Sequence, residues 1–264
     1  MSETLQSSGV PETFTGGLLR GRTALVTGGG AKNGIGRAIA NLFAAHGAKV
    51  AIADIDGNLA NEAANTLGPD HLGLTCDIGR EDDCKKAVEA VVSAFGTVDI
   101  LVNNAGIGYR RQLMDIGMDE FDKIMQVNMR GTFAMTQAVI PVMREKRSGN
   151  IIFVSSTAAQ RGGGVYGSSH YVASKAGMSG FARAVAREFA PVGIRANIIS
   201  PNLIKTDITV DMPPEERAAI EKGVPLQRSG TPYDVAGAAL FLASDLSGYV
   251  AGASIDVNGG FHIS

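Results

Sequence analysis

The chain has 264 residues, which is enough for one domain with a full hydrophobic core. Hydrophobic residues make up 45% of it, charged residues make up 19%, and the formal net charge is only −2. These values are ordinary for a globular protein. The sequence has no basic stripe or arginine-rich run, so we do not expect nucleic acid as a partner.

The two cysteines, Cys76 and Cys84, indicate structural thiols in a reducing compartment. No His/Cys cluster has the spacing of metal ligands, so we expect no metal. Residues 1–20 lack the basic start and apolar core of a signal peptide, and no apolar run approaches the roughly 20 residues that cross a bilayer. We therefore expect a cytoplasmic protein without membrane contact, in which residues 1–20 form a flexible tail before a domain at 21–264.

From Arg22 onward, short apolar runs alternate with helical patterns. The runs, apolar or β-branched and about four to six residues long, are predicted as strands at Thr23–Thr27, Lys49–Ala53, His71–Thr75, Val98–Val102, Ile151–Val154, Ile194–Ile199 and Ser254–Val257. Helices are predicted at Ile35–His46, Leu59–Leu67, Glu81–Phe95, Met118–Arg144, His170–Ala190 and Tyr233–Ala243. This alternation predicts a single α/β domain with a doubly wound parallel sheet of about seven strands and helices on both faces. The stretch 203–230 is expected to be an excursion over a site.

Tyr171 and Lys175 are four residues apart and therefore share one face of a predicted helix. Moving a tyrosine pKa from about 10 to about 7 needs roughly 4 kcal/mol. One cation at roughly 4 Å, at an effective dielectric near 20, supplies about that much. A tyrosine so placed exchanges protons with an alcohol near neutral pH. The alternative is an exposed tyrosine and lysine on an amphipathic helix.

The glycine-rich turn at 27–36 follows the first predicted strand and opens the first helix. Glycines let the backbone approach a pyrophosphate closely, and the helix N-terminus favours the negative charge of that group. Gly28, Asn33, Gly34 and Ile35 are the candidate contacts. A plain strand–helix connection is the alternative.

Asp54 ends the second predicted strand, eighteen residues after Gly36. A carboxylate at this position accepts hydrogen bonds from the adenosine ribose hydroxyls and repels a 2′-phosphate, so we predict NAD as cofactor, in preference to NADP. Asp54 has the alternative role of capping the helix that follows Asp56. Lys32 argues for NADP, because a cation in the glycine turn can meet that phosphate.

Further motifs follow in a fixed order along the chain: Cys76-Asp77-Ile78, Asn103-Asn104-Ala105-Gly106, Val127-Asn128-Met129-Arg130-Gly131, Ser155-Ser156, Ser200-Pro201 to Thr206, and Val257-Asn258-Gly259-Gly260. With the glycine turn and the Tyr171–Lys175 pair, they resemble the short-chain dehydrogenase/reductase family from about Arg22 to the C-terminus. The resemblance implies a single NAD(P)-binding Rossmann-type domain, in a protein that usually forms a homotetramer.

The resemblance also implies residue roles. The implied catalytic set is Asn128, Ser156, Tyr171 and Lys175. The implied cofactor contacts are Gly28, Asn33, Gly34, Ile35, Asp54, Ile55, Asp77, Ile78, Asn104, Ala105, Gly106, Tyr171, Lys175, Pro201, Ile204 and Thr206. Tyr171 is expected to act as general acid/base, Ser156 to bind the substrate oxygen, Lys175 to lower the tyrosine pKa and hold the nicotinamide ribose, and Asn128 to anchor a water.

Three features depart from the family pattern. Five residues separate Gly28 from Gly34, where the family commonly has three, so the phosphate contacts of residues 29–33 stay open. Fifteen positions separate Ser156 from Tyr171, against about thirteen commonly, and we expect the extra length to bulge at 162–164. Asn202 stands where a glycine often follows Pro201.

Two neighbours compete for catalytic roles. Ser155 is the rival of Ser156, and only one of the two can face the site, because adjacent strand residues point to opposite faces. Tyr166 is the rival of Tyr171, but its neighbour four positions on is His170, so it is better interpreted as a loop or pocket residue.

The substrate is the least determined part. Arg111 and Arg161, with Tyr166, lie in loops expected around the site, and guanidinium groups bind carboxylates and phosphates. They motivate the hypothesis of a small anionic hydroxy or keto substrate; solvated loop arginines are the alternative. The sequence therefore predicts an NAD-dependent oxidoreductase that interconverts a secondary alcohol and a ketone, with a 3-oxoacyl thioester reductase or a non-catalytic dinucleotide sensor as alternatives.

Overall fold

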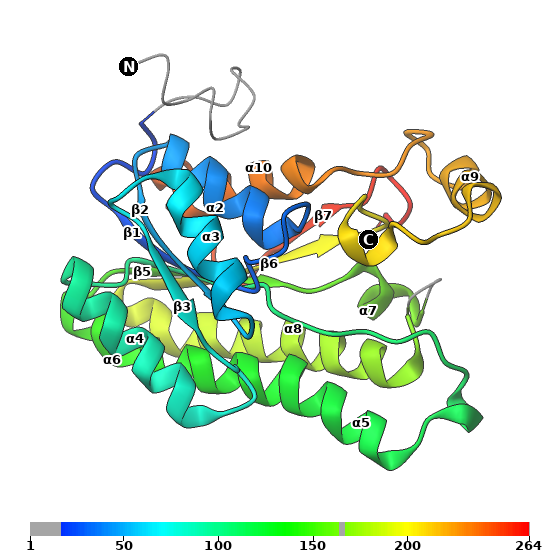
Figure 1. The fold of residues 1–264 in the computed structure, drawn as a ribbon, viewed down its shortest axis with the longest axis horizontal. Coiled ribbons are helices and arrows are strands. Elements are labelled where there is room, and N and C mark those ends of the chain that lie inside the picture. Colours follow the sequence, from blue (N-terminus) through cyan, green and yellow to red (C-terminus); the bar gives the residue numbers. More distant parts are fainter. Residues whose placement is uncertain (1–16, 164–166, 264) are drawn as a thin grey trace.

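The computed structural model describes residues 17–163 and 167–263, and in them seven strands form one sheet (Figure 1). The strands are β1 Thr23–Thr27, β2 Lys49–Asp54, β3 Leu72–Thr75, β4 Ile100–Asn103, β5 Gly149–Val154, β6 Ile194–Pro201 and β7 Ser254–Val257. All neighbours pair in parallel, in the order β3-β2-β1-β4-β5-β6-β7. The predicted parallel sheet of about seven strands is therefore confirmed.

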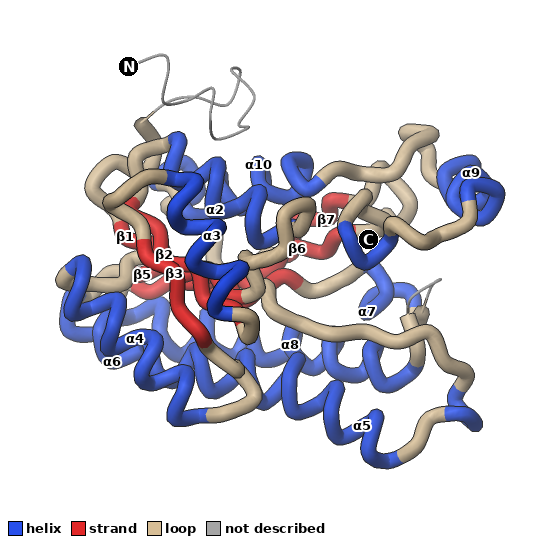
Figure 2. Tube along the Cα trace, viewed as in Figure 1, coloured by secondary structure: helices blue, strands red, loops and turns tan. Residues whose placement is uncertain are grey.

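Helices cover both faces of the sheet (Figures 1 and 2). They are α2 Ile35–Ala45, α3 Gly57–Leu67, α4 Glu81–Phe95, α5 Met118–Ile124, α6 Thr132–Lys146, α7 Thr157–Arg161, α8 Ser169–Phe189, α9 Pro214–Lys222 and α10 Pro232–Ala243. The helices α2, α3 and α10 pack on one face, and α4, α6 and α8 pack on the other. Along β1, Val26 joins the first core and Leu25 the second, because successive side chains of a strand point to opposite faces.

The strand order reverses direction at β1, which has β2 on one side and β4 on the other. Ligands of open α/β sheets bind outside the carboxyl ends of the strands at such a switch point, where the connecting loops diverge. The glycine turn after β1, Asp54 at the end of β2 and the 103–106 motif at the end of β4 all lie at this crevice.

The helix predicted at Met118–Arg144 is two helices, α5 and α6, joined by a π-helical segment at Met125–Gly131. A π-helical turn contains an extra residue, which an apolar pattern with a period near 3.6 does not reveal. The five-residue helix α7 was not predicted, because so short a helix shows no clear period. It ends at Gly162 with φ +79°; the bulge expected at 162–164 stays a prediction, because residues 164–166 lie outside the described residues.

The predicted boundary between tail and domain at residue 20 is wrong. Leu19 is fully buried in the core beside α2, and its N–H donates to the carbonyl of His46 at 3.0 Å. The domain therefore includes residues before 21, while residues 1–16 lie outside the described part of the chain. Among the described helices, none is both long and apolar enough to span a bilayer.

Candidate active site

The glycine turn leaves no room for side chains at two positions. Gly28 has φ +67°, and a Cβ there would lie 2.7 Å from Cα of Ala105. A Cβ on Gly36 would lie 2.4 Å from the carbonyl oxygen of Gly28. The helix α2 starts after Gly34 with no side-chain cap and no acidic residue in its first turn, so its N-terminus suits an anion. These residues fit a dinucleotide pyrophosphate.

Arg37 holds the turn in place and was not predicted from the sequence. Its buried guanidinium donates from Nε to the carbonyl of Gly29 at 3.2 Å and from Nη2 to the carbonyl of Gly30 at 2.8 Å. Burial lowers the pKa of Arg37, and the charges of Glu62 and Asp54 oppose that shift. The sequence feature that could have indicated this role is a basic residue in the first turn of the predicted helix.

Asp54 lies partly exposed beside the glycine turn. Its Oδ2 accepts the N–H of Gly30 at 2.8 Å, and its Oδ1 accepts the N–H of Asp56 at 3.2 Å. The helix α3 is capped by Asp56, which accepts from the N–H groups of residues 58 and 59, so the capping alternative for Asp54 is wrong. Ile55 is 68% exposed next to it, and Lys32 is exposed in the turn.

The turn after β3 contains the two residues predicted to contact the cofactor, Asp77 and Ile78, and only the first is accessible. Asp77 is partly exposed, and its Oδ1 accepts the N–H of Gly79 at 2.9 Å. Ile78 is buried, and its Cγ1 would lie 2.8 Å from a Cβ on Gly131. Packing against the π-helical segment leaves little of Ile78 for the predicted contact with an adenine ring.

Asn104 joins the ends of β1 and β4 across the switch point. Its Nδ2 donates to the carbonyls of Thr27 and Gly28 at 3.0 and 2.9 Å. The Thr27 hydroxyl accepts the N–H groups of Asn104 and Ala105, each at 3.1 Å. At Gly106 a Cβ would lie 3.1 Å from Asn128 Oδ1 and 3.3 Å from Lys175 Nζ, so this motif borders the predicted catalytic residues.

Asn128 is fully buried in the π-helical segment. Its Oδ1 accepts the N–H of Ile107 at 2.8 Å, and its Nδ2 donates to the Ile107 carbonyl at 2.8 Å and to Ser174 Oγ at 3.0 Å. The amide therefore fixes the loop after β4 against α8, and both of its N–H groups are used. The predicted anchoring of a water by Asn128 stays a prediction.

The two serines after β5 have different surroundings. Ser155 is buried, and its Oγ donates to the carbonyl of Lys175 at 3.0 Å and lies 2.8 Å from Ser179 Oγ, so it packs against α8. Ser156 caps α7 by accepting the N–H of Ala158 at 3.1 Å, and its side chain hydrogen-bonds that of Tyr171. The structure thus brings Ser156, and not Ser155, to the tyrosine.

Tyr171 and Lys175 lie in the first turns of α8, and both are perturbed by burial. Lys175 is buried, its Nζ donates to the carbonyl of Val154 at 2.8 Å, and burial lowers its pKa to about 8. Burial raises the pKa of Tyr171, and the hydrogen bond from Ser156 opposes that rise.

The predicted lowering of the Tyr171 pKa by Lys175 to near 7 stays a prediction, and burial acts against it. The lysine Nζ lies 5.9 Å from the centroid of the Tyr171 ring and is bonded to a backbone carbonyl. Desolvation of the phenolate is the largest influence on the Tyr171 pKa and raises it. The phenol is therefore kept neutral, which suits it to donate a proton to an oxygen that gains negative charge.

Comparisons with known proteins agree with this geometry. A family model described as "Enoyl-(Acyl carrier protein) reductase" matches residues 29–262. An uncharacterized short-chain type dehydrogenase/reductase, y4mP of Sinorhizobium fredii, is 51% identical over 251 residues, covering 93% of this chain and 99% of that protein. The 3-oxoacyl-[acyl-carrier-protein] reductase FabG of Escherichia coli is 40% identical over 243 residues, covering 92% and 98%.

Among solved structures, the 3-ketoacyl-(acyl-carrier-protein) reductase of Brucella melitensis complexed with NADH aligns with a TM-score of 0.86. It is 37% identical, and the match covers 93% of this chain and all of that one. The chain belongs to the short-chain dehydrogenase/reductase family. It is an oxidoreductase with a Rossmann-type fold.

In this dehydrogenase/reductase the lengthened glycine turn reaches across the crevice. Asn33 donates to the carboxylate of Asp207 from its backbone N–H at 3.2 Å and from Nδ2 at 2.8 Å. One of the two Nδ2 hydrogens stays available, so the phosphate contact of Asn33 stays a prediction. Thr206 caps the short turn at 207–209, and Ile204 is buried and forms a bridge with Gly230.

The excursion at 203–230 is attached on its other side as well. Arg110, in the loop after β4, donates to both carboxylate oxygens of Glu216 on α9 at 3.1 and 2.6 Å. Pro201 is buried at the end of β6, where the excursion begins. The excursion therefore spans the crevice between the glycine turn and the loop after β4, as its predicted position over a site requires.

The arginines predicted to bind an anionic substrate are both engaged by the protein. Arg111 Nε lies 3.5 Å from Glu120 Oε2. Arg161 donates to the carbonyl of Phe261 at 2.9 Å, and its guanidinium carbon lies 4.1 Å from the centroid of that ring. Both arginines are exposed, so they fit the alternative of solvated loop arginines better than the hypothesis of an anionic substrate. Tyr166 lies outside the described residues.

The lowered pKa of Lys175 predicts a pH dependence of stability. Between its pKa of about 8 in the folded state and its ordinary value of 10.5, the unfolded chain binds more protons, so stability rises with pH. Wild type should gain roughly 2 kcal/mol more unfolding free energy than Lys175→Met between pH 7 and pH 10. Urea titrations at both pH values measure this. The exposed Lys86→Met is the control and should follow wild type; a Lys175→Met profile parallel to wild type contradicts the pKa.

Proposed function

We propose that this oxidoreductase interconverts a secondary alcohol and a ketone with NAD, and that Tyr171 is its general acid/base. The observation that carries the proposal is the meeting of Ser156, Tyr171 and buried Lys175 beside the Gly106 loop, next to a glycine turn that fits a pyrophosphate. When bound, the nicotinamide accepts a hydride in oxidation and donates one in reduction.

Each of the three side chains has a separate role in the reaction. The neutral Tyr171 phenol donates its proton as the substrate carbonyl becomes an alkoxide, and takes it back in the oxidative direction. The Ser156 hydroxyl, which hydrogen-bonds the Tyr171 side chain, is placed to donate to the substrate oxygen when substrate is bound and so to stabilise the developing charge. Lys175 is a cation below a pH of about 8, so it favours the phenolate form of Tyr171 and can donate to a ribose hydroxyl.

A 3-oxoacyl thioester is the substrate class favoured next. The relatives from Escherichia coli and Brucella melitensis are named as reductases of 3-oxoacyl or 3-ketoacyl groups on acyl carrier protein. The substrate of such a reaction is a ketone, so the same residues serve in the same roles.

The Tyr171→Phe variant tests the proposal. Loss of the hydroxyl proposed to donate the proton should lower kcat about 10³-fold or more, in keeping with general acid catalysis plus lost orientation of the substrate oxygen. Affinity for NADH should stay within about threefold. The measurement is the change in NADH absorbance with acetoacetyl-coenzyme A and a panel of ketones and secondary alcohols.

The matched control is Tyr233→Phe, whose hydroxyl lies 3.5 Å from Asn41 Nδ2 on the α2–α10 side of the sheet. It should retain wild-type turnover. Turnover by Tyr171→Phe comparable to wild type would exclude the acid/base role, and a wild type inactive toward the whole panel would favour a dinucleotide sensor.

Asp54 supports NAD over NADP as the cofactor. Its carboxylate lies at the end of β2 beside the glycine turn and retains acceptor capacity after bonding two backbone N–H groups. Asp54→Asn should raise the ratio of kcat/KM for NADPH to that for NADH by about 10-fold or more, because a like-charge repulsion of roughly 1–2 kcal/mol is removed. Asp56→Asn, the same charge change at the cap of α3, is the control. An unchanged ratio in Asp54→Asn, or an equal change in Asp56→Asn, contradicts the assignment.

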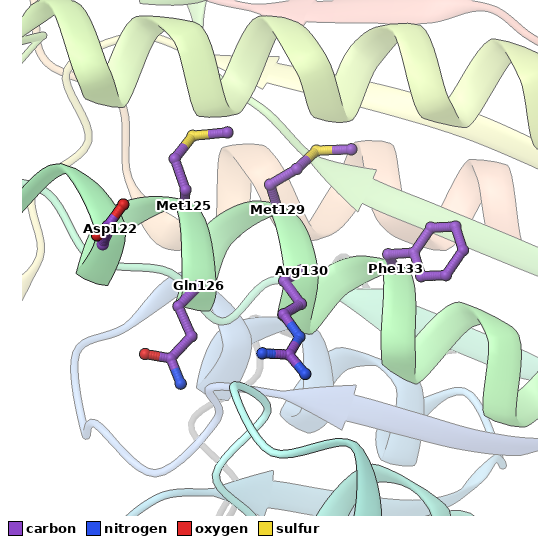
Figure 3. Close-up of a pocket in the computed structure, with 6 residues that line it drawn as sticks. All are labelled: Asp122, Met125, Gln126, Met129, Arg130 and Phe133. Atoms are coloured by element: carbon purple, nitrogen blue, oxygen red, sulfur yellow. The ribbon is translucent and has the colours of Figure 1, made fainter.

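We also propose a homotetramer, and a groove on the outer surface supports it. Figure 3 shows Met125 and Met129 directed toward α8, while Gln126 and Arg130 point away from it. The groove has a volume of about 640 Å³ and continues to Phe133, which is 45% exposed. The centroid of its ring lies 5.2 Å from that of Phe181 on α8, with the planes tilted by 37°. The apolar faces predicted to pair across a two-fold axis thus have unburied surface.

Phe133→Glu tests this assembly. A carboxylate in a desolvated helix interface should shift the protein from tetramer to smaller species, while the monomer fold tolerates it because the ring is already half exposed. Light scattering coupled to size exclusion measures the mass. Leu18→Glu, with 43% exposure, is the control and should stay tetrameric. A wild-type monomer, or a tetrameric Phe133→Glu, would refute the proposal.

A further inference from the structure

His170 immediately precedes Tyr171, and nothing in the site described above uses it. Its side chain is 1% exposed, and Nε2 lies 3.0 Å from Glu120 Oε1 on α5. Its Nδ1 is buried with no hydrogen-bond partner among the described residues. A buried polar atom without a partner costs stability, so an apolar residue would pack here more favourably. Stability alone does not explain a histidine at this position.

The imidazole connects three elements that surround Tyr171. Glu120 bonds His170 through Oε1 and lies 3.5 Å from Arg111 Nε through Oε2. The ring of Tyr109 stacks on the imidazole with centroids 6.4 Å apart and planes 22° apart. The start of α5 and the loop after β4 are thereby fastened to the first turn of α8.

That loop packs directly on the catalytic ring. A Cβ on Gly108 would lie 3.2 Å from Cδ2 of Tyr171 and 3.4 Å from its Cε2, so the loop backbone lies in contact with the phenol. On one side of Gly108, Asn128 hydrogen-bonds both the N–H and the carbonyl of Ile107. The other side is held at residues 109–111 by the Ser168 hydroxyl and by the His170–Glu120 pair.

We infer that His170 is a positioning residue for Tyr171: bonded to Glu120 and stacked on Tyr109, it fixes the loop that sets the orientation of the phenol. The inference rests on the proposed role of Tyr171. A displacement of about 1 Å in a reacting group costs up to about 10²-fold in rate, so a side chain that touches neither substrate nor cofactor can control turnover in this way.

The test compares His170→Leu with His170→Gln. Leucine fills the space but loses the bond to Glu120, whereas the glutamine amide nitrogen can replace Nε2. With acetoacetyl-coenzyme A and NADH, His170→Leu should lower kcat about 10- to 100-fold with the KM for NADH within about threefold. His170→Gln should recover most of the loss. His46→Leu, a buried histidine at the end of α2, is the control for loss of a buried imidazole and should keep wild-type kcat.

A His170→Leu variant within twofold of wild type would overturn the inference. So would equal losses in His170→Leu and His170→Gln, or a comparable loss in His46→Leu. If His170→Leu does not fold, Glu120→Gln, whose side chain is 22% exposed, weakens the same link and should lower kcat severalfold. An unchanged kcat in that variant would also overturn the inference.

A second readout is independent of turnover and separates this inference from the proposed function. Burial raises the pKa of Tyr171, so a loosened loop that admits water should lower it. Tyrosinate absorbance, corrected with the Tyr171→Phe variant, should show a lower Tyr171 pKa in His170→Leu than in wild type. An unshifted pKa overturns the inference, whereas absent wild-type turnover with every ketone overturns only the proposed function.

Discussion

A buried ammonium group is the constraint on which the rest of the site depends. Lys175 is withdrawn from water and bonded to the carbonyl of Val154, and its pKa of about 8 reflects the cost of that burial. An apolar side chain would make the same fold easier to form, so the cation is better explained by chemistry than by stability. The same low-dielectric surroundings keep the neighbouring phenol of Tyr171 neutral, which provides a proton donor beside a cation.

The sheet topology brings the other groups to this pair. Because β1 lies between β2 and β4, the glycine turn, Asp54 and the Asn104 motif meet at one crevice, and β5 adds Ser156. The π-helical segment then supplies Asn128, whose amide holds the loop after β4 in place. The excursion at 203–230 is joined to both walls of the crevice by hydrogen bonds from Asn33 and Arg110 to its carboxylates.

Much of this was predictable, and the failures have physical causes. Strands buried between two helical layers are apolar runs, so the sheet could be predicted from the sequence. The ordered motifs identified the family, and the family pattern correctly predicted that Ser156, rather than Ser155, lies at Tyr171. The π-helical segment was not predictable, because one extra residue leaves the apolar pattern almost unchanged. The Asn33–Asp207 contact joins residues 174 positions apart. The direction of the Tyr171 pKa shift depends on a burial that spacing along a helix does not fix.

Direct transfer of a carbon-bound hydrogen is the central claim, and isotope tracing tests it most directly. A secondary alcohol carrying deuterium on its carbinol carbon would be oxidised with NAD, and the reduced cofactor and the water would be analysed by mass spectrometry. The account predicts deuterium in the reduced cofactor, with only the hydroxyl proton, which passes through Tyr171, released to water. Deuterium found in the water, with an unlabelled cofactor, would contradict it.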